Sequence, residues 1–191
     1  MNICVYGASS KTIDKDYIAA GETLGKIMAE RGHTLVFGGG GSGLMGAAAR
    51  GVKGAGGKAV GVAPSFFNVD GILYDNCDDF IYTETMRERK QIMENMSDGF
   101  VMTPGGIGTF EEFFEILTLR QLGKHQKPIA VLNTNGYFTS LVKMIEDAIA
   151  GGFMTEKNRS LFGVFESPEE AVLYIEEHNG ATGSLGEYKN V

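Results

Sequence analysis

The chain has 191 residues, of which 43% are hydrophobic, and this is enough for one domain with a buried core. Its 17 basic and 24 acidic side chains give a formal net charge of −7, which argues against a protein that binds the nucleic-acid backbone. No apolar run approaches the ~18 residues that cross a bilayer, so we predict a single domain over residues 1–191 without membrane association.

The N-terminal sequence MNICVYG is typical of a strand and has no basic segment, so we predict no signal peptide and a cytoplasmic protein. Cys4 and Cys77 form neither a C-x-x-C pair nor a disulfide framework. His33, His125 and His178 are isolated and lack the spacing of metal ligands, so we predict no metal site.

Predicted strands and helices alternate through the first half of the chain. We expect strands at residues 2–7, 33–38, 58–64 and 78–83, and helices at 17–31 and 44–52. Residues 66–77 have no clear period and are expected to be irregular. Thr85 and Glu88 have the spacing of a capping box, which predicts a helix from there to about Asn95.

The alternation continues in the second half. We expect strands at residues 99–104 and 127–133, and helices at 109–122 and 137–150. Ser167 and Pro168 are typical of the start of a last helix, and the glycine-rich residues 179–191 are expected to be a flexible tail. This order predicts an α/β fold, in which a mainly parallel sheet carries helices on both faces.

Ligands of open parallel sheets bind at the carboxyl ends of the strands. The predicted loops at that edge are the most unusual segments of the chain: GASS at 7–10, GGGGSGLMG at 38–46, TETMRERK at 83–90 and TPGGIGT at 103–109. We therefore look for the functional site among these four loops.

The loop at 41–46 matches G-x-G-x-x-G, but a dinucleotide-binding protein is not favoured. That fingerprint normally follows the first strand and has an acidic residue about 20 positions later. Here it follows the second strand, and residues 65–67 contain no acid. A tight turn and the backbone wall of a ligand cleft both remain open. No G-x-x-x-x-G-K-[ST] motif is present, which argues against a P-loop NTPase.

The segment from Thr103 to Thr109 favours a phosphate site. Its glycines let the backbone approach a ligand, and the helix that follows offers unpaired N–H groups and a partial positive charge. We expect Thr109 to cap that helix and to donate its hydroxyl to the ligand. A tight turn without a ligand is the alternative.

The helix after this loop has one apolar and one polar side. The apolar stripe is expected in the core and consists of Phe110, Phe113, Phe114 and Leu117. The other side carries Glu111, Glu112, Glu115 and Thr118. These residues either form a solvated acidic face, or Glu112 in the first turn faces the ligand of the glycine loop.

An arginine interrupts a methionine stripe in the segment TETMRERK. Met86, Met93 and Met96 share one side of the predicted helix, and Arg89 lies between them. Leaving a buried charge unpaired costs about 3–5 kcal/mol, so Arg89 needs an anionic partner. A structural carboxylate, Glu112 across the cleft and a ligand phosphate are the three candidates.

Together these motifs resemble the LOG ("Lonely guy") family, the cytokinin riboside 5′-monophosphate phosphoribohydrolases that were long mislabelled as lysine decarboxylases. The family pattern P-G-G-x-G-T-x-x-E matches residues 104–112, and M-x-x-R-K matches residues 86–90. The patterns G-x-S-S and G-G-G-x-x-G-L-M-G are similar to residues 7–10 and 38–46. The likeness covers roughly residues 2–176, with the motifs in family order.

The resemblance implies a Rossmann-like three-layer α/β/α fold without a dinucleotide or metal cofactor, usually in a homodimer. It implies cleavage of the N-glycosidic bond of a purine nucleoside 5′-monophosphate, plain AMP or an N6-substituted form, to free base and ribose 5-phosphate. Arg89 and Glu112 would be the catalytic pair. The substrate would be bound by Lys90, Gly105, Gly106, Ile107, Gly108, Thr109, Glu111, Thr118, Gly7, Ser9, Gly39, Gly40, Gly43 and Met45.

The chain departs from the family pattern at three places that concern the base. Ile107 replaces the usual tyrosine or phenylalanine, Arg87 stands where many members have histidine, and SFFNVDG after Pro64 lacks the common charged residue. Two other functions remain open. One is a non-catalytic carrier of a nucleotide or cofactor, and the other is a pyridoxal-phosphate decarboxylase with Lys90 as its Schiff-base lysine.

Overall fold

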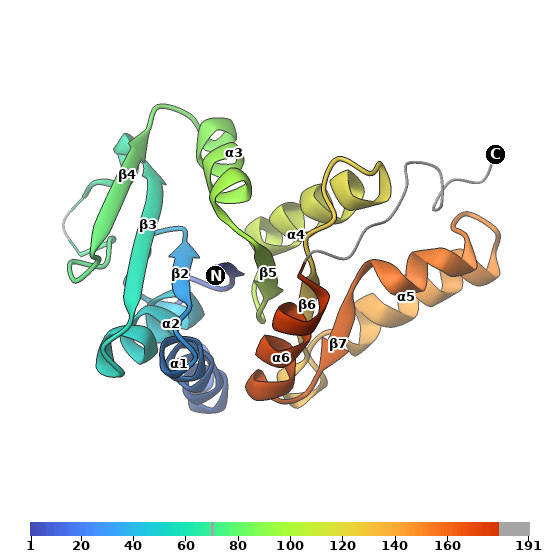
Figure 1. Cartoon of the computed structure of the whole chain (residues 1–191), viewed down its shortest axis with the longest axis horizontal. Helices are drawn as coiled ribbons and strands as arrows, with labels where there is room; N and C mark the ends of the chain where they lie inside the picture. Colours follow the sequence, from blue (N-terminus) through green and yellow to red (C-terminus); the bar gives the residue numbers. More distant parts are fainter. Residues whose placement is uncertain (70, 180–191) are drawn as a thin grey trace.

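The computed structural model describes residues 1–69 and 71–179. Its strands form one sheet in the order β4-β3-β2-β1-β5-β6-β7, in which every pair of neighbours is parallel (Figure 1). The strands are β1 (Asn2–Tyr6), β2 (Thr34–Phe37), β3 (Lys58–Pro64), β4 (Asp79–Thr83), β5 (Gly99–Met102), β6 (Ile129–Leu132) and β7 (Gly163–Phe165). The predicted tail, apart from Asn179, lies outside the described residues.

Six α-helices of the described chain connect or follow these strands. They are α1 (Lys15–Glu30), α2 (Gly43–Gly54), α3 (Met86–Met96), α4 (Ile107–Gln121), α5 (Thr139–Ala150) and α6 (Pro168–His178). Three 3-10 turns, η1 (Ser65–Phe67), η2 (Thr134–Gly136) and η3 (Glu156–Leu161), lie in the connections. The predicted irregular segment 66–77 contains part of η1 and an isolated bridge between Gly40 and Leu73.

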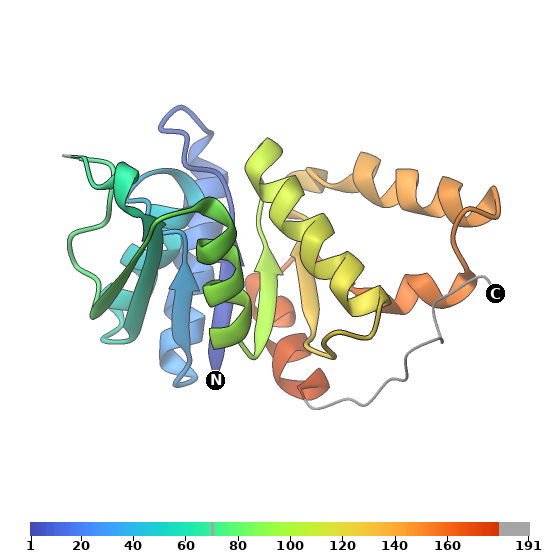
Figure 2. The ribbon, with the colours of Figure 1, turned by 90° about the horizontal axis from the view of Figure 1, so that it is seen from above.

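Helices cover both faces of the sheet, so the predicted Rossmann-like three-layer α/β/α fold is confirmed. One core cluster joins the sheet to α1, α2 and α6 through Leu24, Ala48 and Val172. A second cluster on the opposite face joins it to α3 and α4 through Met93 and Phe113. Figure 2 shows α3 and α4 together over this second face.

Local sequence signals explain several helix boundaries. Thr85 accepts a hydrogen bond from the Glu88 amide while the Glu88 carboxylate accepts one from the Thr85 amide, which is the predicted capping box. Ser167 caps α6 and Pro168 is its first residue, as predicted. Asp14 caps α1, which therefore begins two residues earlier than the predicted Tyr17.

Sequence patterns missed β7 and also misplaced the starts of α4 and α5. The three residues of β7 are too few to show a period, and only their pairing with β6 defines the strand. Helix α4 begins at Ile107 instead of Thr109, and α5 begins at Thr139 instead of Tyr137 because η2 precedes it. These shifts matter because both segments adjoin the predicted site.

Helices α1 and α2 lie unusually close to each other. A Cβ atom on Gly25 would overlap the backbone carbonyl of Ala48, so this contact requires glycine.

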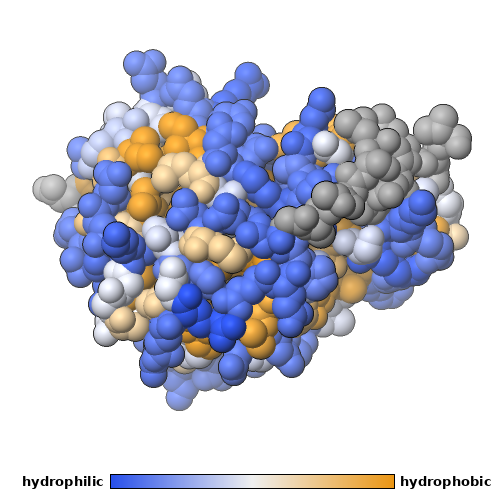
Figure 3. All heavy atoms as spheres, in the orientation of Figure 1, coloured by the Kyte–Doolittle hydropathy of each residue, from blue (hydrophilic) through white to orange (hydrophobic). Residues whose placement is uncertain are grey.

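Figure 3 shows that the surface facing the viewer is mostly hydrophilic, with separate hydrophobic groups. None of the helices in residues 1–69 and 71–179 has the length and apolar character that a membrane crossing requires.

Candidate active site

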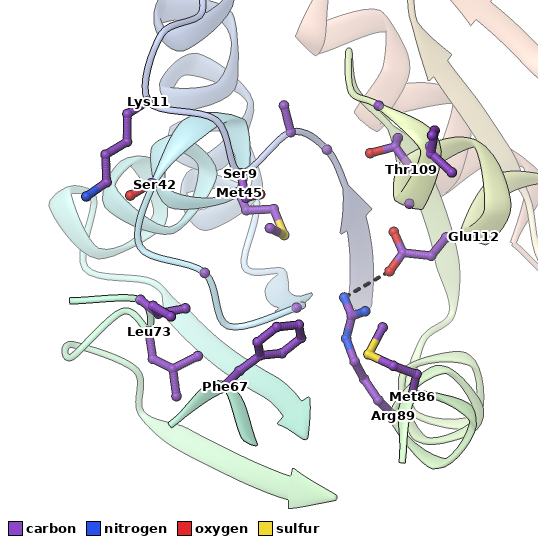
Figure 4. A pocket seen from close by; sticks show the side chains of 18 of the residues that line it. Ser9, Lys11, Ser42, Met45, Phe67, Leu73, Met86, Arg89, Thr109 and Glu112 are labelled. Atoms are coloured by element: carbon purple, nitrogen blue, oxygen red, sulfur yellow. Dashed lines mark ion pairs between the residues drawn. The ribbon is translucent and has the colours of Figure 1, made fainter. Parts of the chain in front are cut away.

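A pocket of about 580 Å³ lies at the carboxyl ends of the strands, where the sheet order reverses between β1 and β5. This is the expected ligand position in an open α/β sheet, and the volume is within the usual range for small-molecule sites. Figure 4 shows side chains from both halves of the sheet around the pocket. Its wall includes Gly7, Ser9, Gly40, Met45, Arg89, Gly106, Ile107, Gly108, Thr109 and Glu112.

Arg89 enters the pocket from α3 and is 7% exposed. Its Nε donates a hydrogen bond to the Val62 carbonyl over 3.2 Å, and its Nη2 lies 2.8 Å from Oε1 of Glu112. A Cβ atom on Gly38 would overlap this Nη2, so the glycine leaves room for the guanidinium. Of the three partners considered for Arg89, the structure supplies Glu112.

Glu112 points into the pocket from α4 and meets Arg89 there (Figure 4). Because α4 begins at Ile107, Glu112 lies in the second helical turn and not in the predicted first turn. Glu112 is 7% exposed, and this burial raises the pKa of its carboxyl group above the ordinary value of 4.5. The positive charge of Arg89 opposes that rise. Glu112 is therefore a buried carboxylate that accepts a proton more readily than an exposed glutamate.

The glycine loop is fixed to the end of β1 and to the residues that follow it by three hydrogen bonds. Both the amide and the hydroxyl of Thr103 donate to the Tyr6 carbonyl, over 2.8 and 2.9 Å, and the Ala8 amide donates to the Pro104 carbonyl over 3.1 Å. A Cβ atom on Gly105 would overlap the Thr109 hydroxyl, so glycine is required there. The loop is held rigidly beside the pocket.

The predicted N-cap of α4 was wrong. Gly106 occupies that position without a side-chain cap, and Thr109 is the third residue of the helix. The backbone amides of Gly106, Ile107, Gly108 and Thr109 donate to no acceptor within residues 1–69 and 71–179. Four consecutive free amides at a helix N-terminus suit an anion.

Lys90, Glu111 and Thr118 do not join the pocket wall. The Lys90 ammonium is held by the carboxylates of Glu111 and Glu115, which pack beside it on α4. Thr118 is exposed and lies farther along the same helix. Because Lys90 is engaged outside the wall, the geometry does not favour it as a Schiff-base lysine.

The second glycine loop contributes both wall residues and support. Gly40 and Met45 line the pocket, while Gly39 just before them and Gly43 between them adopt left-handed turns with φ angles of 75° and 62°. A Cβ atom on Gly43 would also overlap the Ala8 carbonyl. Of the two interpretations left open for this loop, backbone lining of a ligand cleft is the one that the structure supports.

Several wall residues were missing from the predicted site. Lys11, Ser42, Ile72 and Leu73 all line the pocket. Lys11 directly follows the GASS loop, and this position in the sequence could have indicated that it lines the pocket. Ile72 and Leu73 come from the irregular segment after η1, where no periodicity marks them.

The apolar stripes were only partly correct. Phe113 and Leu117 are buried, but Phe114 is 37% exposed. Met93 is fully buried in the core, whereas Met86 and Phe67 line the pocket. These two side chains give the pocket an apolar side opposite the glycine loop (Figure 4).

Two of the three histidines, His33 and His125, make hydrogen bonds outside the pocket. His33 contacts the Glu176 carboxylate over 2.7 Å, and His125 donates to the Ile116 carbonyl over 2.8 Å. Burial lowers the pKa of His125 to about 4, so it is neutral near pH 7. Within residues 1–69 and 71–179, no three His, Cys, Asp or Glu side chains are grouped to hold a metal ion.

A second hollow of about 660 Å³ lies between α1 and α2, away from this chemistry. It is lined mainly by small residues and by charged side chains at the surface. Arg50 pairs with Glu22 over 3.0 Å, and Lys26 pairs with Glu30 over 3.7 Å. Its charges are already matched, so we assign no function to it.

Comparison with known proteins agrees with this geometry. Residues 45–175 match the family model described as "Possible lysine decarboxylase". The chain is 36% identical over 176 residues to the cytokinin riboside 5′-monophosphate phosphoribohydrolase LOG of Oryza sativa subsp. japonica, covering 92% of this chain and 73% of the rice protein. The chain belongs to the LOG family. The Arabidopsis thaliana phosphoribohydrolase LOG3 is 34% identical, covering 92% of this chain and 82% of that protein.

The solved structures that share the fold of this LOG family member include proteins of a second kind. The Moco carrier protein of Chlamydomonas reinhardtii superposes with a TM-score of 0.71 and 27% identity, covering 92% of this chain and 95% of that one. The molybdenum cofactor binding protein of Rippkaea orientalis superposes with a TM-score of 0.69 at 22% identity, which shows the fold alone. The family and fold are therefore clear, while relatives with this fold differ in what they bind.

Proposed function

We propose that this protein is a phosphoribohydrolase that cleaves the N-glycosidic bond of a purine nucleoside 5′-monophosphate, releasing the base and ribose 5-phosphate. One observation carries the proposal. The buried Arg89–Glu112 ion pair, 2.8 Å long, lies in the same pocket as the glycine loop with its free amides. Membership of the LOG family supports the same reaction.

The 5′-phosphate would bind at the N-terminus of α4. Four free amides from Gly106 to Thr109 face no protein acceptor in the described chain, and the helix adds about half a positive charge. The apolar side, with Phe67 and Met86, would then receive the base. Binding the phosphate at one end holds the sugar in a fixed place beside Glu112.

Hydrolysis consumes one water molecule. As the C1′–N9 bond breaks, its electron pair leaves with the base and the sugar takes on oxocarbenium character. The Glu112 carboxylate stabilises that positive charge and accepts a proton from the attacking water, whose hydroxyl oxygen bonds to C1′. A proton then reaches the departing base, so the reaction adds H to the base and OH to the sugar.

Arg89 would keep Glu112 ionised and oriented. It is anchored by the Val62 carbonyl as well as by Glu112, so the carboxylate faces a fixed cation. Without the guanidinium, burial would favour the protonated acid, which cannot act as a base. A contact between the other guanidinium nitrogens and the ribose or phosphate is compatible with this role.

The test is the release of free base from AMP by Arg89→Ala and Glu112→Ala. We expect each variant to lose about 10²–10⁴-fold in kcat/KM, the usual contribution of a positioned acid or base. Arg159→Ala and Glu146→Ala are matched controls, because this exposed pair lies outside the pocket. Near wild-type turnover by either pocket variant would refute the assignment.

A carrier function is the second candidate, and the 27% identical Moco carrier protein of Chlamydomonas reinhardtii favours it. A carrier would bind its ligand without turnover, so tight binding of a nucleotide without release of base would support it.

The resemblance to the LOG family also supports the proposal that the protein is a cytoplasmic homodimer. Sedimentation of the purified protein tests the oligomeric state.

A further inference from the structure

Tyr137 holds the glycine loop from outside the pocket. Its hydroxyl donates a hydrogen bond to the carbonyl oxygen of Gly105 over 2.6 Å. The tyrosine follows η2 and is absent from the pocket wall, whereas Gly106, the next residue of the loop, is part of that wall. The loop therefore runs between Tyr137 on one side and the pocket on the other.

The geometry of a trans peptide links this contact to the pocket. In a planar trans peptide, the carbonyl oxygen and the following N–H point in opposite directions, and no cis bond occurs in the described chain. Because the Gly105 carbonyl points to Tyr137, the Gly106 amide points away from Tyr137. The tyrosine hydroxyl thereby sets the direction of the first free amide.

The backbone beside this contact also leaves a second amide free. Gly105 lies four residues before Thr109, so its carbonyl would accept from the Thr109 amide if the helix began one residue earlier. The Gly105 carbonyl instead meets Tyr137, and Gly106 has an extended backbone with φ −97° and ψ −153°, so the first helical bond joins the Phe110 amide to the Gly106 carbonyl over 3.1 Å. The Thr109 amide consequently stays free for a ligand.

The turn before α5 is built to hold Tyr137 in place. The Asn133 side chain accepts from the Phe138 amide over 2.7 Å and donates to Glu166 over 2.8 Å. Asn135 and Gly136 adopt left-handed conformations with φ angles of 53° and 69°, which Asn and Gly tolerate best. The position of the hydroxyl is thus fixed by its own element.

We propose that Tyr137 is a positioning residue, which keeps the Gly106 amide directed at the phosphate of the substrate. The inference rests on the proposed function, because that function assigns the phosphate to the Gly106 amide and the three amides that follow it. Tyr137 touches neither the sugar nor the base. Its removal therefore weakens recognition of the phosphate and leaves the bond-breaking groups Arg89 and Glu112 in place.

Tyr137→Phe tests this role, because it deletes the hydroxyl and keeps the ring. Tyr17→Phe is the matched control, since the Tyr17 ring meets Tyr137 edge-on at 6.0 Å and its hydroxyl has no hydrogen bond within residues 1–69 and 71–179. Calorimetry with ribose 5-phosphate measures the phosphate site without turnover. We expect roughly fivefold weaker binding for Tyr137→Phe, the size of one hydrogen bond, and unchanged binding for Tyr17→Phe.

Steady-state kinetics distinguishes a role of Tyr137 in positioning the phosphate-binding amide from a general effect of the substitution on the structure. For AMP, Tyr137→Phe should raise KM about fivefold with kcat within about twofold, whereas kcat/KM for adenosine, which has no phosphate, should not change. Equal losses on AMP and adenosine, or unchanged affinity for ribose 5-phosphate, would overturn the proposal. Thermal unfolding of each variant verifies that the compared proteins are folded.

Failure of the proposed function can be distinguished from failure of the role proposed for Tyr137. If the wild-type protein binds ribose 5-phosphate but releases no base, the enzymatic proposal fails while the Tyr137 comparison still stands on calorimetry. If Tyr137→Phe binds as tightly as the wild type, the positioning role fails even when turnover is normal. Should Tyr137→Phe be unfolded, Tyr137→Met supplies the same comparison with a flexible apolar side chain.

Discussion

Arg89 and Glu112 form an ion pair of 2.8 Å between α3 and α4, and each side chain is only 9% exposed. Removing one partner of a buried pair leaves the other charge uncompensated, at a cost of about 3–5 kcal/mol. A pair this costly to break, placed in a pocket and not in the core, indicates that both charges face a ligand.

Gly38→Ala is expected to damage activity by moving Arg89. The new Cβ would overlap Nη2 of Arg89 and approach Sδ of Met45 to 3.2 Å, so the guanidinium must shift from Glu112. A displacement of about 1 Å in a catalytic group costs about 10²-fold in rate. Steady-state kinetics with AMP measures the loss. Gly54→Ala is the control, because a Cβ there meets no atom within 4 Å. Equal kinetics for the two variants would contradict the role given to Arg89.

The pH dependence of kcat/KM should report Glu112. Burial raises the pKa of this carboxyl above 4.5, and the proposed base must be ionised. Activity is therefore complete above the raised pKa and is lost as the pH falls through it, so the acidic limb should lie above pH 4.5. A pH–rate profile from pH 4 to 8 shows the limb. A midpoint below pH 4 would mean that Glu112 is not the titrating base.

Glu176 is expected to make stability depend on acid pH. Its hydrogen bond with Arg31, followed by that with His33, lowers the pKa of the carboxyl to about 2. A lowered folded-state pKa gives stability that is complete above the unfolded value of 4.5 and is lost as the pH falls toward 2. Glu176→Gln should remove about 1 kcal/mol at pH 7, measured by urea unfolding.

Two comparisons test that reading of Glu176. The difference in unfolding free energy between Glu176→Gln and the wild type should shrink as the pH is lowered from 5 to 3. Glu30→Gln removes an exposed carboxylate that is 3.7 Å from Lys26, and should change stability by much less. A difference for Glu176→Gln that is independent of pH would show that its ion pairs are not the cause.

The fold was largely predictable because its signals are local. Thr85 with Glu88, and Ser167 with Pro168, mark helix starts through contacts a few residues apart. By contrast, β7 exists through pairing with β6, and three residues have no detectable period. Residues whose structure depends on distant partners were the ones that sequence patterns missed.

The site residues divide in the same way, into those with a local sequence signal and those that depend on distant partners. Arg89 stood out because an arginine on an apolar stripe needs an anion, and Glu112 supplies it. The orientation of Lys90 toward α4, away from the pocket, depends on Glu111 and Glu115 and follows from the packing of two helices. The start of α4 could not be predicted, because it follows from the extended backbone of Gly106 and lies beside a contact between Gly105 and Tyr137, 32 positions along the chain.

The most direct test of the account is chromatographic detection of free base, with AMP and isopentenyl-AMP incubated side by side with the wild-type protein and with Glu112→Gln. The account predicts release of adenine or isopentenyladenine together with ribose 5-phosphate in equal amounts by the wild type. It predicts a loss of about 10²–10⁴-fold for Glu112→Gln, which retains the size of the side chain and lacks its charge. No release from either nucleotide by the folded wild-type protein, or full release by Glu112→Gln, would contradict it.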